Sequence, residues 1–385
     1  MSKPKIRFKG YEEDWEQRKL ENIVEVCSGR DYKHLEAGNI PVYGTGGYML
    51  SVSEALSYDV DAIGIGRKGT IDKPYILKAP FWTVDTLFYC ICKEGHNLNF
   101  VYDIFQNINW KAMDESTGVP SLSKTTINKV KTLIPSYLEQ EKIGKYFSCL
   151  DKLITLHQRK CEETKKLKKY MLQKMFPQNG KRVPEIRFAG FTDDWEQRKL
   201  GDVTELKSAS RVHKGEWTDS GVPFFRSSDV MAAINGTTNE KAYISEELYE
   251  KLSNASGKLE EGDVLVTGGG SVGNPYIVPN NEPLYTKDAD LLWIKNQGRF
   301  YPYFLYEYFF SPTFRIYLSS ISHVGTIAHY TITQLSETPI SLPDIEEQIK
   351  VGEYFESLDR LITLHQRKYE ELQKIKKFML QNMFI

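Results

Sequence analysis

The chain has 385 residues, enough for two domains, of which 41% are hydrophobic and 26% charged. It contains no apolar run of about 18 residues or more, and its charged N-terminus lacks the apolar stretch of a signal peptide, so we expect a cytoplasmic protein. The formal net charge of −1 argues against a protein that coats nucleic acid with a broad field of lysines.

The opening segment of the chain returns in its second half. Residues 4–20 read PKIRFKGYEEDWEQRKL, and residues 184–200 read PEIRFAGFTDDWEQRKL, with 12 of 17 positions identical. An internal repeat of this kind predicts two related halves, 1–183 and 184–385.

The region after the first opening segment is expected to mix α and β structure. Short apolar stretches bounded by Gly and Pro predict strands at Ala62–Ile65 and Tyr75–Leu77, and an aromatic-rich stretch predicts a helix at Asn99–Asn107. The sequence GIGRKG at 64–69 fits GxGxxG, but TIDKPYIL follows it, with Pro where a nucleotide-binding helix would propagate. We therefore expect a tight turn between two strands and no nucleotide site.

The next segment predicts a long helix. Residues 140–176 contain no Pro or Gly after Gly144, and their apolar residues recur at alternating spacings of four and three. Residues 348–384 repeat this segment with 25 of 37 positions identical, at an offset of 208 residues. The seam positions include Phe147, Leu150, Ile154 and His157 in the first copy and Phe355, Leu358, Ile362 and His365 in the second.

Two such seams in one chain predict an antiparallel coiled-coil pair of rods about 55 Å long. The alternative is that each helix caps its own domain. The lysine-rich face of the first helix, which includes Lys165, Lys166, Lys168 and Lys169, is expected to be solvated, and the alternative is that it lies near DNA phosphates.

The second variable region resembles the first only faintly. Its stretch DVLVTGGGSVGNPYIV at 263–278 parallels AIGIGRKGTIDKPYIL at 62–77, which predicts a strand at Asp263–Thr267 and a turn at Gly268–Gly273. A helical stretch is expected at Pro302–Ser319. Near-identical helices do the same job twice, whereas diverged domains of common origin do related but different jobs.

The predicted fold class is therefore α+β, with two α/β domains joined by two long antiparallel coiled-coil helices in a pseudo-two-fold internal repeat. The expected parts are a first domain at 1–136, a central helix and linker at 137–183, a second domain at 184–345, and a C-terminal helix at 346–385.

Charge is unevenly distributed along the chain. Residues 134–183 hold 12 Lys and Arg against 5 Asp and Glu, whereas residues 201–345 hold 11 against 18. A second domain with this acidic balance must bind DNA through a few placed cations, if it binds DNA at all.

The sequence contains no catalytic or metal-binding constellation. It lacks the [DN]PP[YF] motif of amino-methyltransferases, HExxH and the phosphate-binding loop GxxxxGK[ST]. The five cysteines form no CxxC pair, so free thiols in a reducing compartment are expected. We expect a protein that is not an enzyme and that binds no metal or cofactor.

These motifs, in this order, give the chain a resemblance over essentially its whole length to the specificity subunit of type I restriction-modification systems. Each half opens with IRFxG[YF] and WEQRKL, continues with a glycine-centred turn, and enters its helix through Pro135…Glu139-Gln140 or Pro343…Glu347-Gln348. The helices then contain LDKLITLHQRK and LDRLITLHQRK. The first half departs in having VYGTG at 42–46 where the second has FFRSSD at 224–229, so these two loops are not expected to contact DNA alike.

The resemblance implies that each variable domain is a target-recognition domain that reads one half of a bipartite DNA site. The repeated helices would act as a spacer that binds two methyltransferase subunits, and two restriction subunits would join that core. S-adenosylmethionine would be held by the methyltransferase, and ATP with magnesium by the restriction subunit. The predicted spacer and partner residues are Phe147, Leu150, Ile154, Phe355, Leu358 and Ile362.

Candidate DNA contacts follow from residue type and loop position. Arginine can bond O6 and N7 of guanine together, and serine can contact a base or a phosphate. The candidates are Arg67, Lys68 and Thr70 at the first glycine turn, Lys124, His329 and Tyr330 before the helices, and Arg226, Ser227 and Ser228 after Gly221-Val-Pro. The alternative for each is an ordinary surface turn or, for His329 and Tyr330, a place in the core.

Two other functions remain open. A non-catalytic coiled-coil scaffold that binds protein partners without reading DNA would explain the acidic second domain. A methyltransferase in its own right would need to bind the cofactor as an isolated chain.

Overall fold

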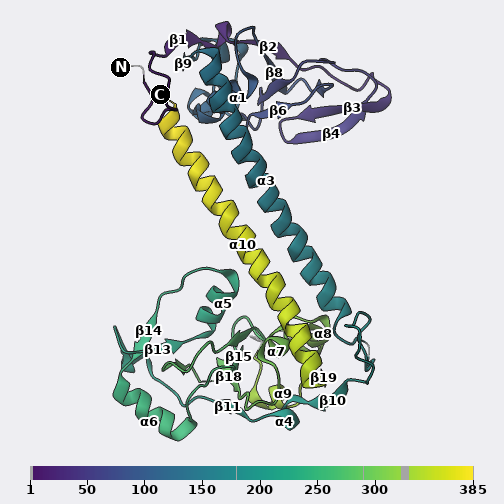
Figure 1. Cartoon of the computed structure of the whole chain (residues 1–385), viewed down its shortest axis with the longest axis vertical. Coiled ribbons are helices and arrows are strands. Elements are labelled where there is room, and N and C mark those ends of the chain that lie inside the picture. Colours follow the sequence, from purple (N-terminus) through teal and green to yellow (C-terminus); the bar gives the residue numbers. More distant parts are fainter. Residues whose placement is uncertain (1–2, 179, 289, 322–328, 385) are drawn as a thin grey trace. The chain divides into compact units, whose positions relative to one another are not determined.

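The computed structural model describes residues 3–178, 180–288, 290–321 and 329–384 (Figure 1). The chain forms two compact units, and each unit takes parts from both halves of the sequence. The first unit comprises Met1–Arg159 and His365–Ile385, and the second comprises Lys160–Leu364. Within the described ranges, no helix is both long and apolar enough to cross a membrane.

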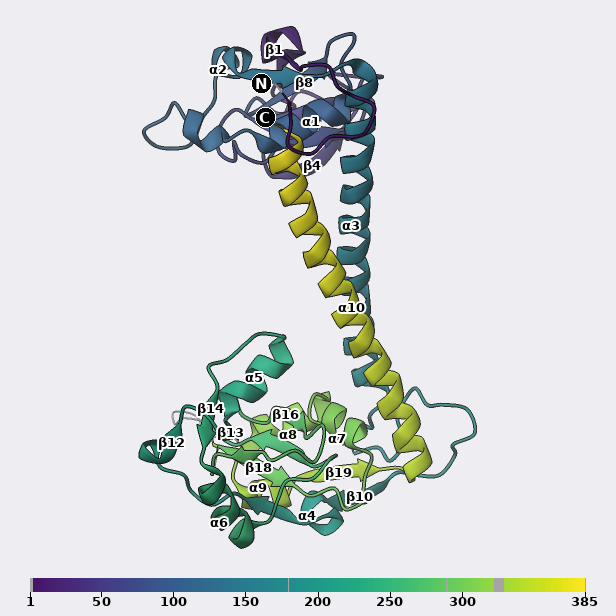
Figure 2. The same cartoon turned by 60° about the vertical axis from the view of Figure 1, so that its left-hand side comes forward.

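Three small sheets build the first unit (Figure 2), with strand orders β2-β8-β5-β6, β4-β3-β7 and β1-β9. Its strands are β1 Glu16–Lys19, β2 Val24–Ser28, β3 Ala37–Gly44, β4 Gly47–Val52, β5 Ala62–Gly66, β6 Tyr75–Leu77, β7 Trp82–Thr83, β8 Leu87–Cys92 and β9 Lys131–Ile134. Its helices are α1 Leu98–Asn107 and α2 Lys124–Lys129, followed by the first part of the long helix α3 Tyr137–Lys174.

The second unit repeats this plan, with strand orders β11-β18-β15-β16, β12-β14-β13-β17 and β10-β19. Its strands are β10 Glu196–Lys199, β11 Leu206–Ser208, β12 Trp217–Thr218, β13 Val222–Phe225, β14 Ala242–Ile244, β15 Val264–Thr267, β16 Pro275–Ile277, β17 Tyr285–Thr286, β18 Leu291–Ile294 and β19 Pro339–Leu342. Its helices are α4 Leu200–Val203, α5 Ser227–Asn235, α6 Glu246–Ser256, α7 Pro302–Tyr308, α8 Pro312–Ile321, α9 Ile332–Ser336 and the first part of the long helix α10 Ile345–Met383.

Both glycine-rich motifs lie in turns between antiparallel strands, as predicted. The first turn joins β5 to β6, and the second joins β15 to β16. A side chain at Gly66 would overlap the carbonyl oxygen of Thr70, so the first turn requires a glycine there. A strand follows each turn, and therefore neither turn offers a helix N-terminus to a pyrophosphate.

One predicted helix is divided. The stretch Pro302–Ser319 was expected to be continuous, but it forms α7 and α8 with a break at Phe309–Ser311. Pro312 explains the break, because its ring and missing N–H favour the first turn of a new helix over the interior of an existing one. The helix predicted at Asn99–Asn107 is confirmed as α1.

The long helices pack in opposite directions, as predicted. In the first unit, Phe147 from the start of α3 shares a hydrophobic core with Met383 from the end of α10. In the second unit, Phe355 from the start of α10 shares a core with Met175 from the end of α3. Each variable domain is thus completed by the end of the helix that belongs to the other sequence half.

A charge cluster in the second unit ties the variable domain to both helices, and the first unit repeats the pair between the helices. In the second unit, Lys168 Nζ lies 2.8 Å from Glu307 Oε1 and 2.6 Å from Asp359 Oδ2. In the first unit, Lys376 pairs with Asp151, the residues equivalent to Lys168 and Asp359 at the offset of 208. The expectation that Lys168 is solvated was wrong, since its side chain is only 16% exposed and contacts the carboxyl groups of Glu307 and Asp359.

This cluster predicts a pH-dependent stability. Burial raises the pKa of Glu307 to about 8, although Lys168 opposes the shift. The folded protein therefore retains a proton that the unfolded chain loses near pH 4.5, so stability contributed by Glu307 should fall as pH rises toward 8. The stability of Glu307→Gln relative to the unsubstituted protein should rise by about 1–3 kcal/mol across this window.

Thermal melting at a series of pH values between about 5 and 8 tests this expectation. Glu346→Gln, which changes an exposed glutamate at the start of α10, is the matched control. A Glu307→Gln variant whose melting temperature followed pH as in the unsubstituted protein would contradict the assignment.

Candidate nucleic-acid interface

Three predicted DNA contacts meet in the first unit, where the β5–β6 turn lies against the loop before α2. The backbone N–H of Gly69 donates to the carbonyl oxygen of Pro120 (2.8 Å), and Leu122 N–H donates to the carbonyl of Arg67 (2.9 Å). These bonds enclose a surface pocket of about 840 Å³, lined among others by Arg67, Lys68, Lys124, Ser116 and Thr117. The residues come from two segments, 67–68 and 116–124, that are at least 48 positions apart, so the fold itself assembles this cationic surface.

The cations of this surface remain open to solvent. Arg67, Lys68 and Lys124 are all exposed, and Thr70 is half-buried at the end of the turn. Arg67 donates to the carbonyl oxygen of Asp85 (3.3 Å), and its guanidinium lies 5.8 Å from the centre of the Phe88 ring. The protein thus orients one arginine from behind while leaving its outer side accessible, which suits contact with phosphates or base edges.

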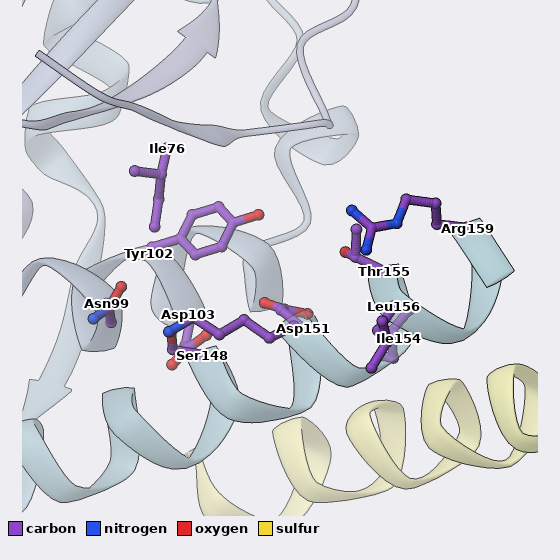
Figure 3. Close-up of a pocket in the computed structure, with 11 residues that line it drawn as sticks. Ile76, Asn99, Tyr102, Asp103, Ser148, Asp151, Ile154, Thr155, Leu156 and Arg159 are labelled. Carbon is purple, nitrogen blue, oxygen red and sulfur yellow. The ribbon is translucent and has the colours of Figure 1, made fainter.

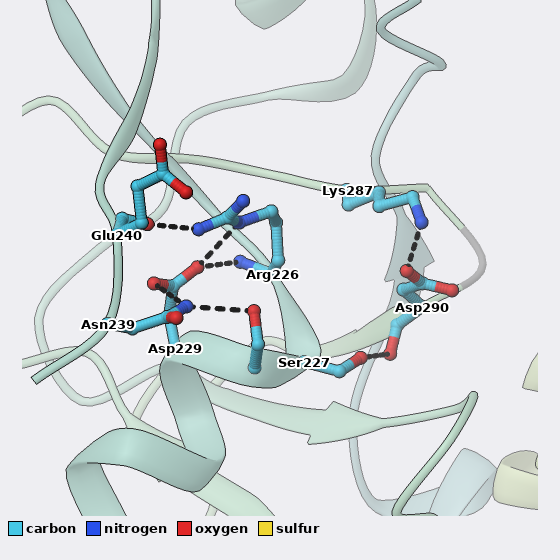
Figure 4. A network of polar contacts seen from close by, with 8 residues as sticks. Arg226, Ser227, Asp229, Asn239, Glu240, Lys287 and Asp290 are labelled. Atoms are coloured by element: carbon cyan, nitrogen blue, oxygen red, sulfur yellow. Dashed lines mark hydrogen bonds and ion pairs between the residues drawn. The ribbon is translucent and has the colours of Figure 1, made fainter. Parts of the chain in front are cut away.

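The corresponding surface of the second unit is built around a polar network at the start of α5 (Figure 4). Arg226 Nε donates to Asp229 Oδ2 (3.0 Å), its backbone N–H donates to the same oxygen (2.9 Å), and its guanidinium also donates to the carbonyl of Glu240. Trp217 lies below the guanidinium at 5.6 Å. These contacts hold Arg226 in place and leave its side chain 19% exposed.

Ser227 links α5 to the second glycine turn. Its hydroxyl donates to the carbonyl oxygen of Asp290 (3.0 Å), and that oxygen also accepts the backbone N–H of Gly268 (2.7 Å). His329 is exposed beside Gly269, and Ser228 accepts a hydrogen bond from the Asn239 amide (2.9 Å). Ser227, the glycine turn and His329 therefore gather at one end of the β15–β18 pair.

Tyr330 differs from the other candidates because it is a core residue. It is 1% exposed, its ring lies 6.0 Å from that of Phe314, and its hydroxyl bonds that of Thr338. Burial raises its pKa. These contacts correspond to the core alternative stated above for this residue.

A family model described as the type I restriction modification DNA specificity domain matches residues 12–166 and again residues 192–374. The chain belongs to the family of type I restriction-modification specificity subunits. The double match coincides with the two halves inferred from the internal repeat.

Known specificity subunits resemble this one at moderate identity. The type I restriction enzyme MjaVIII specificity subunit of Methanocaldococcus jannaschii is 27% identical over 281 residues, which are 69% of this chain but 64% of that relative, just under two thirds of its length. A putative type I restriction enzyme specificity subunit of Haemophilus influenzae is 25% identical, over 85% of this chain and 83% of the relative. The crystal structure of the S subunit from M. genitalium has the same fold, with a TM-score of 0.69 and 13% identity over 100% of this chain and 99% of that one.

Sequence reasoning missed several polar residues of this specificity subunit's candidate interface. Lys287 pairs with Asp290, whose carbonyl holds Ser227, and Asn239 also donates to Asp229 Oδ1 (2.8 Å). No local motif marks these residues. The one available signal is their place directly after a strand or before the next one, where loops of related domains gather.

Arg226 is the candidate whose role a single substitution can define. If it reads a guanine, Arg226→Ala should weaken binding to the specific site by about 1–3 kcal/mol while leaving binding to random duplex largely unchanged. Fluorescence anisotropy on both duplexes measures the two losses. An equal loss on both would make Arg226 a phosphate contact, and no loss on either would remove it from the interface.

A second kind of surface repeats between the units. In the first unit, α1 and α3 border a pocket of about 680 Å³, lined by residues that include Tyr102, Asp103 and Ile154 (Figure 3). The second unit has a pocket of about 620 Å³ at the equivalent place, where Tyr306 and Ile362 are the counterparts of Tyr102 and Ile154. These paired pockets lie between the long helices and the strand that follows each glycine turn.

Among the described residues, no group of three or more His, Cys, Asp and Glu side chains is placed to hold a metal ion. The five cysteines are free thiols, and burial raises the pKa of Cys90 and of Cys92. A raised pKa keeps a thiol protonated and poorly nucleophilic.

Proposed function

We propose that this specificity subunit directs a type I restriction-modification complex to DNA, with each variable domain reading one half of a bipartite, non-palindromic site. The observation that carries the proposal is a contrast between parts. The helices and the exposed EQRK strands β1 and β10 are repeated almost unchanged, whereas the loops at the two candidate DNA surfaces differ in length, charge and structure. Near-identical helices and strands match two copies of one partner, and differing loops match two different half-sites.

We propose that the two partners are methyltransferase subunits, which dock on the outer sides of the helices. Four of the predicted seam residues are buried, namely Phe147, Leu150, Phe355 and Leu358, and Ile154 and Ile362 are partly buried. Most of these side chains therefore pack inside this chain, and little of their surface is available to a partner. A second apolar stripe remains exposed one position before the seam, and it repeats at the offset of 208. Its exposed members are Leu153, Leu167 and Tyr170 on α3 and Leu361, Leu364, Ile375 and Phe378 on α10.

Exposed apolar side chains of this size that recur in register are typical of a protein interface. In the proposed complex, S-adenosylmethionine is held by the methyltransferase subunits, and ATP with magnesium by two restriction subunits. This chain contributes recognition and assembly and no reacting group.

The purified chain alone is therefore expected neither to methylate nor to cut DNA. Incubation of plasmid DNA with the chain and tritiated S-adenosylmethionine should transfer no label, and addition of the methyltransferase subunit should restore transfer at one asymmetric sequence. Label transferred by the chain without its partner would refute the assignment of catalysis to other subunits.

The scaffold function is the second candidate, and the acidic balance of residues 201–345 favours it. Titration with random duplex DNA at low and moderate salt separates the two. A DNA-reading chain should bind with an affinity that falls steeply as salt rises, because phosphate contacts release counterions. A scaffold should show no such binding at either salt concentration.

A further inference from the structure

The β3–β4 hairpin of the first unit ends in a turn of small residues. Tyr43 pairs with Tyr48 and Gly44 with Gly47 across the hairpin, which leaves Thr45 and Gly46 as the turn. Figure 1 shows β3 and β4 extending from the rest of the unit. The backbone of Gly47 has a φ of +107°, a conformation that favours glycine, so the small residues permit a sharp reversal.

Tyr48, directly after this turn, presents an exposed ring on a supported base. Its side chain is 63% exposed, while its ring centre lies 6.4 Å from that of Tyr43, which in turn lies 6.1 Å from that of Tyr75. The Tyr75 hydroxyl donates to the carbonyl oxygen of Gly44 (2.6 Å) and thereby fixes the turn. Three tyrosines thus form a row whose last member is held in place but uncovered.

Cations lie close to the hairpin turn that precedes Tyr48. Thr45 Oγ1 is 3.7 Å from the position that a Cβ atom on Gly69 would occupy, so the hairpin turn lies beside the β5–β6 turn. That turn carries the exposed side chains of Arg67 and Lys68. An exposed aromatic ring at a turn that lies beside a cationic turn matches the chemistry of DNA, in which flat bases lie between rows of phosphates.

The second unit differs at the equivalent place. Phe225 on β13 and Tyr276 on β16 form the ring pair that corresponds to Tyr43 and Tyr75, with centres 4.6 Å apart. After Phe225, however, the chain enters α5 at Ser227, whereas the first unit forms its hairpin turn. The exposed third ring is therefore a feature of the first unit's hairpin.

We propose that Tyr48 inserts its ring against the bases of the half-site read by the first unit and unstacks one base step, while Arg67 and Lys68 hold the adjacent phosphates. The proposal rests on the proposed function, because it assumes that the first variable domain reads DNA. The deformation is one-sided: it occurs in one half-site and not in the other.

The test uses the assembled complex of this chain with its methyltransferase subunits. Its DNA is a duplex containing the asymmetric sequence methylated in cells that carry the system, with 2-aminopurine replacing one adenine at a time at positions other than the base that is methylated in each half-site, because methyltransferases flip that base out of the stack. Unstacking raises 2-aminopurine fluorescence, and we expect the increase in one half-site only. Tyr48→Ala should abolish the increase and weaken binding by about 10- to 100-fold, the range typical of one lost aromatic–base stack. Tyr48→Phe, which keeps the ring, should retain both properties.

Met49→Ala is the matched control, because Met49 is 49% exposed on the opposite face of the same strand. It should bind and fluoresce as the unsubstituted complex does. Three outcomes would overturn the proposal: Tyr48→Ala indistinguishable from the unsubstituted complex, equal losses in Tyr48→Ala and Met49→Ala, or a fluorescence increase in both half-sites. A complex that bound no DNA sequence at all would instead refute the proposed function, so the two failures are distinguishable.

Discussion

The double substitution Leu150→Asp and Leu358→Asp is expected to separate the paired helices and to abolish partner assembly. Both leucines are nearly buried, Leu150 at 7% exposure and Leu358 at 5%, and each lies in the core of a different unit. Truncating a buried leucine to alanine already costs about 2–5 kcal/mol. A carboxylate at such a site also loses its hydration without gaining a partner. The combined loss should exceed the whole stability of an ordinary domain, about 5–15 kcal/mol, or come close to it.

Denaturant unfolding followed by circular dichroism measures the stability, and co-purification with the methyltransferase subunit measures assembly. Leu153→Asp is the matched control, since Leu153 is on the same helix but 38% exposed. It should leave the free energy of unfolding within about 0.5 kcal/mol of its original value. It should nevertheless weaken co-purification if the exposed stripe docks the partner. A stable double variant that still captured its partner would show that the seam does not hold the helices together.

The helices were predictable because their signal is local and occurs twice. The alternating spacing of apolar residues defines the seam within each segment, and the offset of 208 shows which residues are equivalent. Lys168 shows where this reasoning stops. A lysine among lysines suggests solvent, and its actual role depends on Glu307, 139 residues away, which α7 brings against the helix. Only the folded chain reveals that pairing.

The sequence predicted where the candidate residues lie in the fold, but not their contacts. The glycine turn predicted that Arg67 and Lys68 follow a strand, and the fold brings Lys124 to the same pocket. The sequence did not indicate that Arg226 would be engaged by Asp229. Nor did it indicate that β3 and β13, equivalent by their parallel pairing with β7 and β17, would lead into a hairpin and a helix respectively. Such loop differences have no periodicity, so composition alone does not reveal them.

The other large effect is expected from cutting the chain in half. Residues 1–183 keep one variable domain and one long helix, but the core of that domain then lacks the end of α10. In the full chain, Phe384 fills this place, with ring centres 5.5 Å from Phe100 and 5.8 Å from Phe147. Loss of a buried phenylalanine costs about 3–5 kcal/mol. An isolated half is therefore stabilised if another aromatic side chain fills the place of Phe384.

A second copy of the same half can supply that replacement. Phe176 is equivalent to Phe384 at the offset of 208, and in the second unit it already packs against Phe304 and Phe355, the counterparts of Phe100 and Phe147. Lys168 of one copy would likewise take the place of Lys376 beside Asp151 of the other. Histidines at equivalent positions already meet in the full chain, where the Nδ1 atoms of His157 and His365 lie 2.9 Å apart. Two copies of the half can therefore form the same contacts with exact two-fold symmetry.

A symmetric reader binds a symmetric site, whereas unlike domains bind an asymmetric one. Supplied with the methyltransferase subunit, residues 1–183 should therefore redirect modification from the original site to a gapped palindrome made of the first half-site and its inverted copy. The two parts should lie about one helical turn of DNA, roughly 10 base pairs, apart, which is the spacing at which paired domains read two half-sites from one side of the duplex. Sequencing of methylated DNA from cells that carry only this half measures the outcome, and Phe176→Ala in the half should abolish modification by removing the dimer. Methylation of the original asymmetric site by the half-protein would contradict the assignment of one half-site to each variable domain, because a single kind of domain would then be reading both.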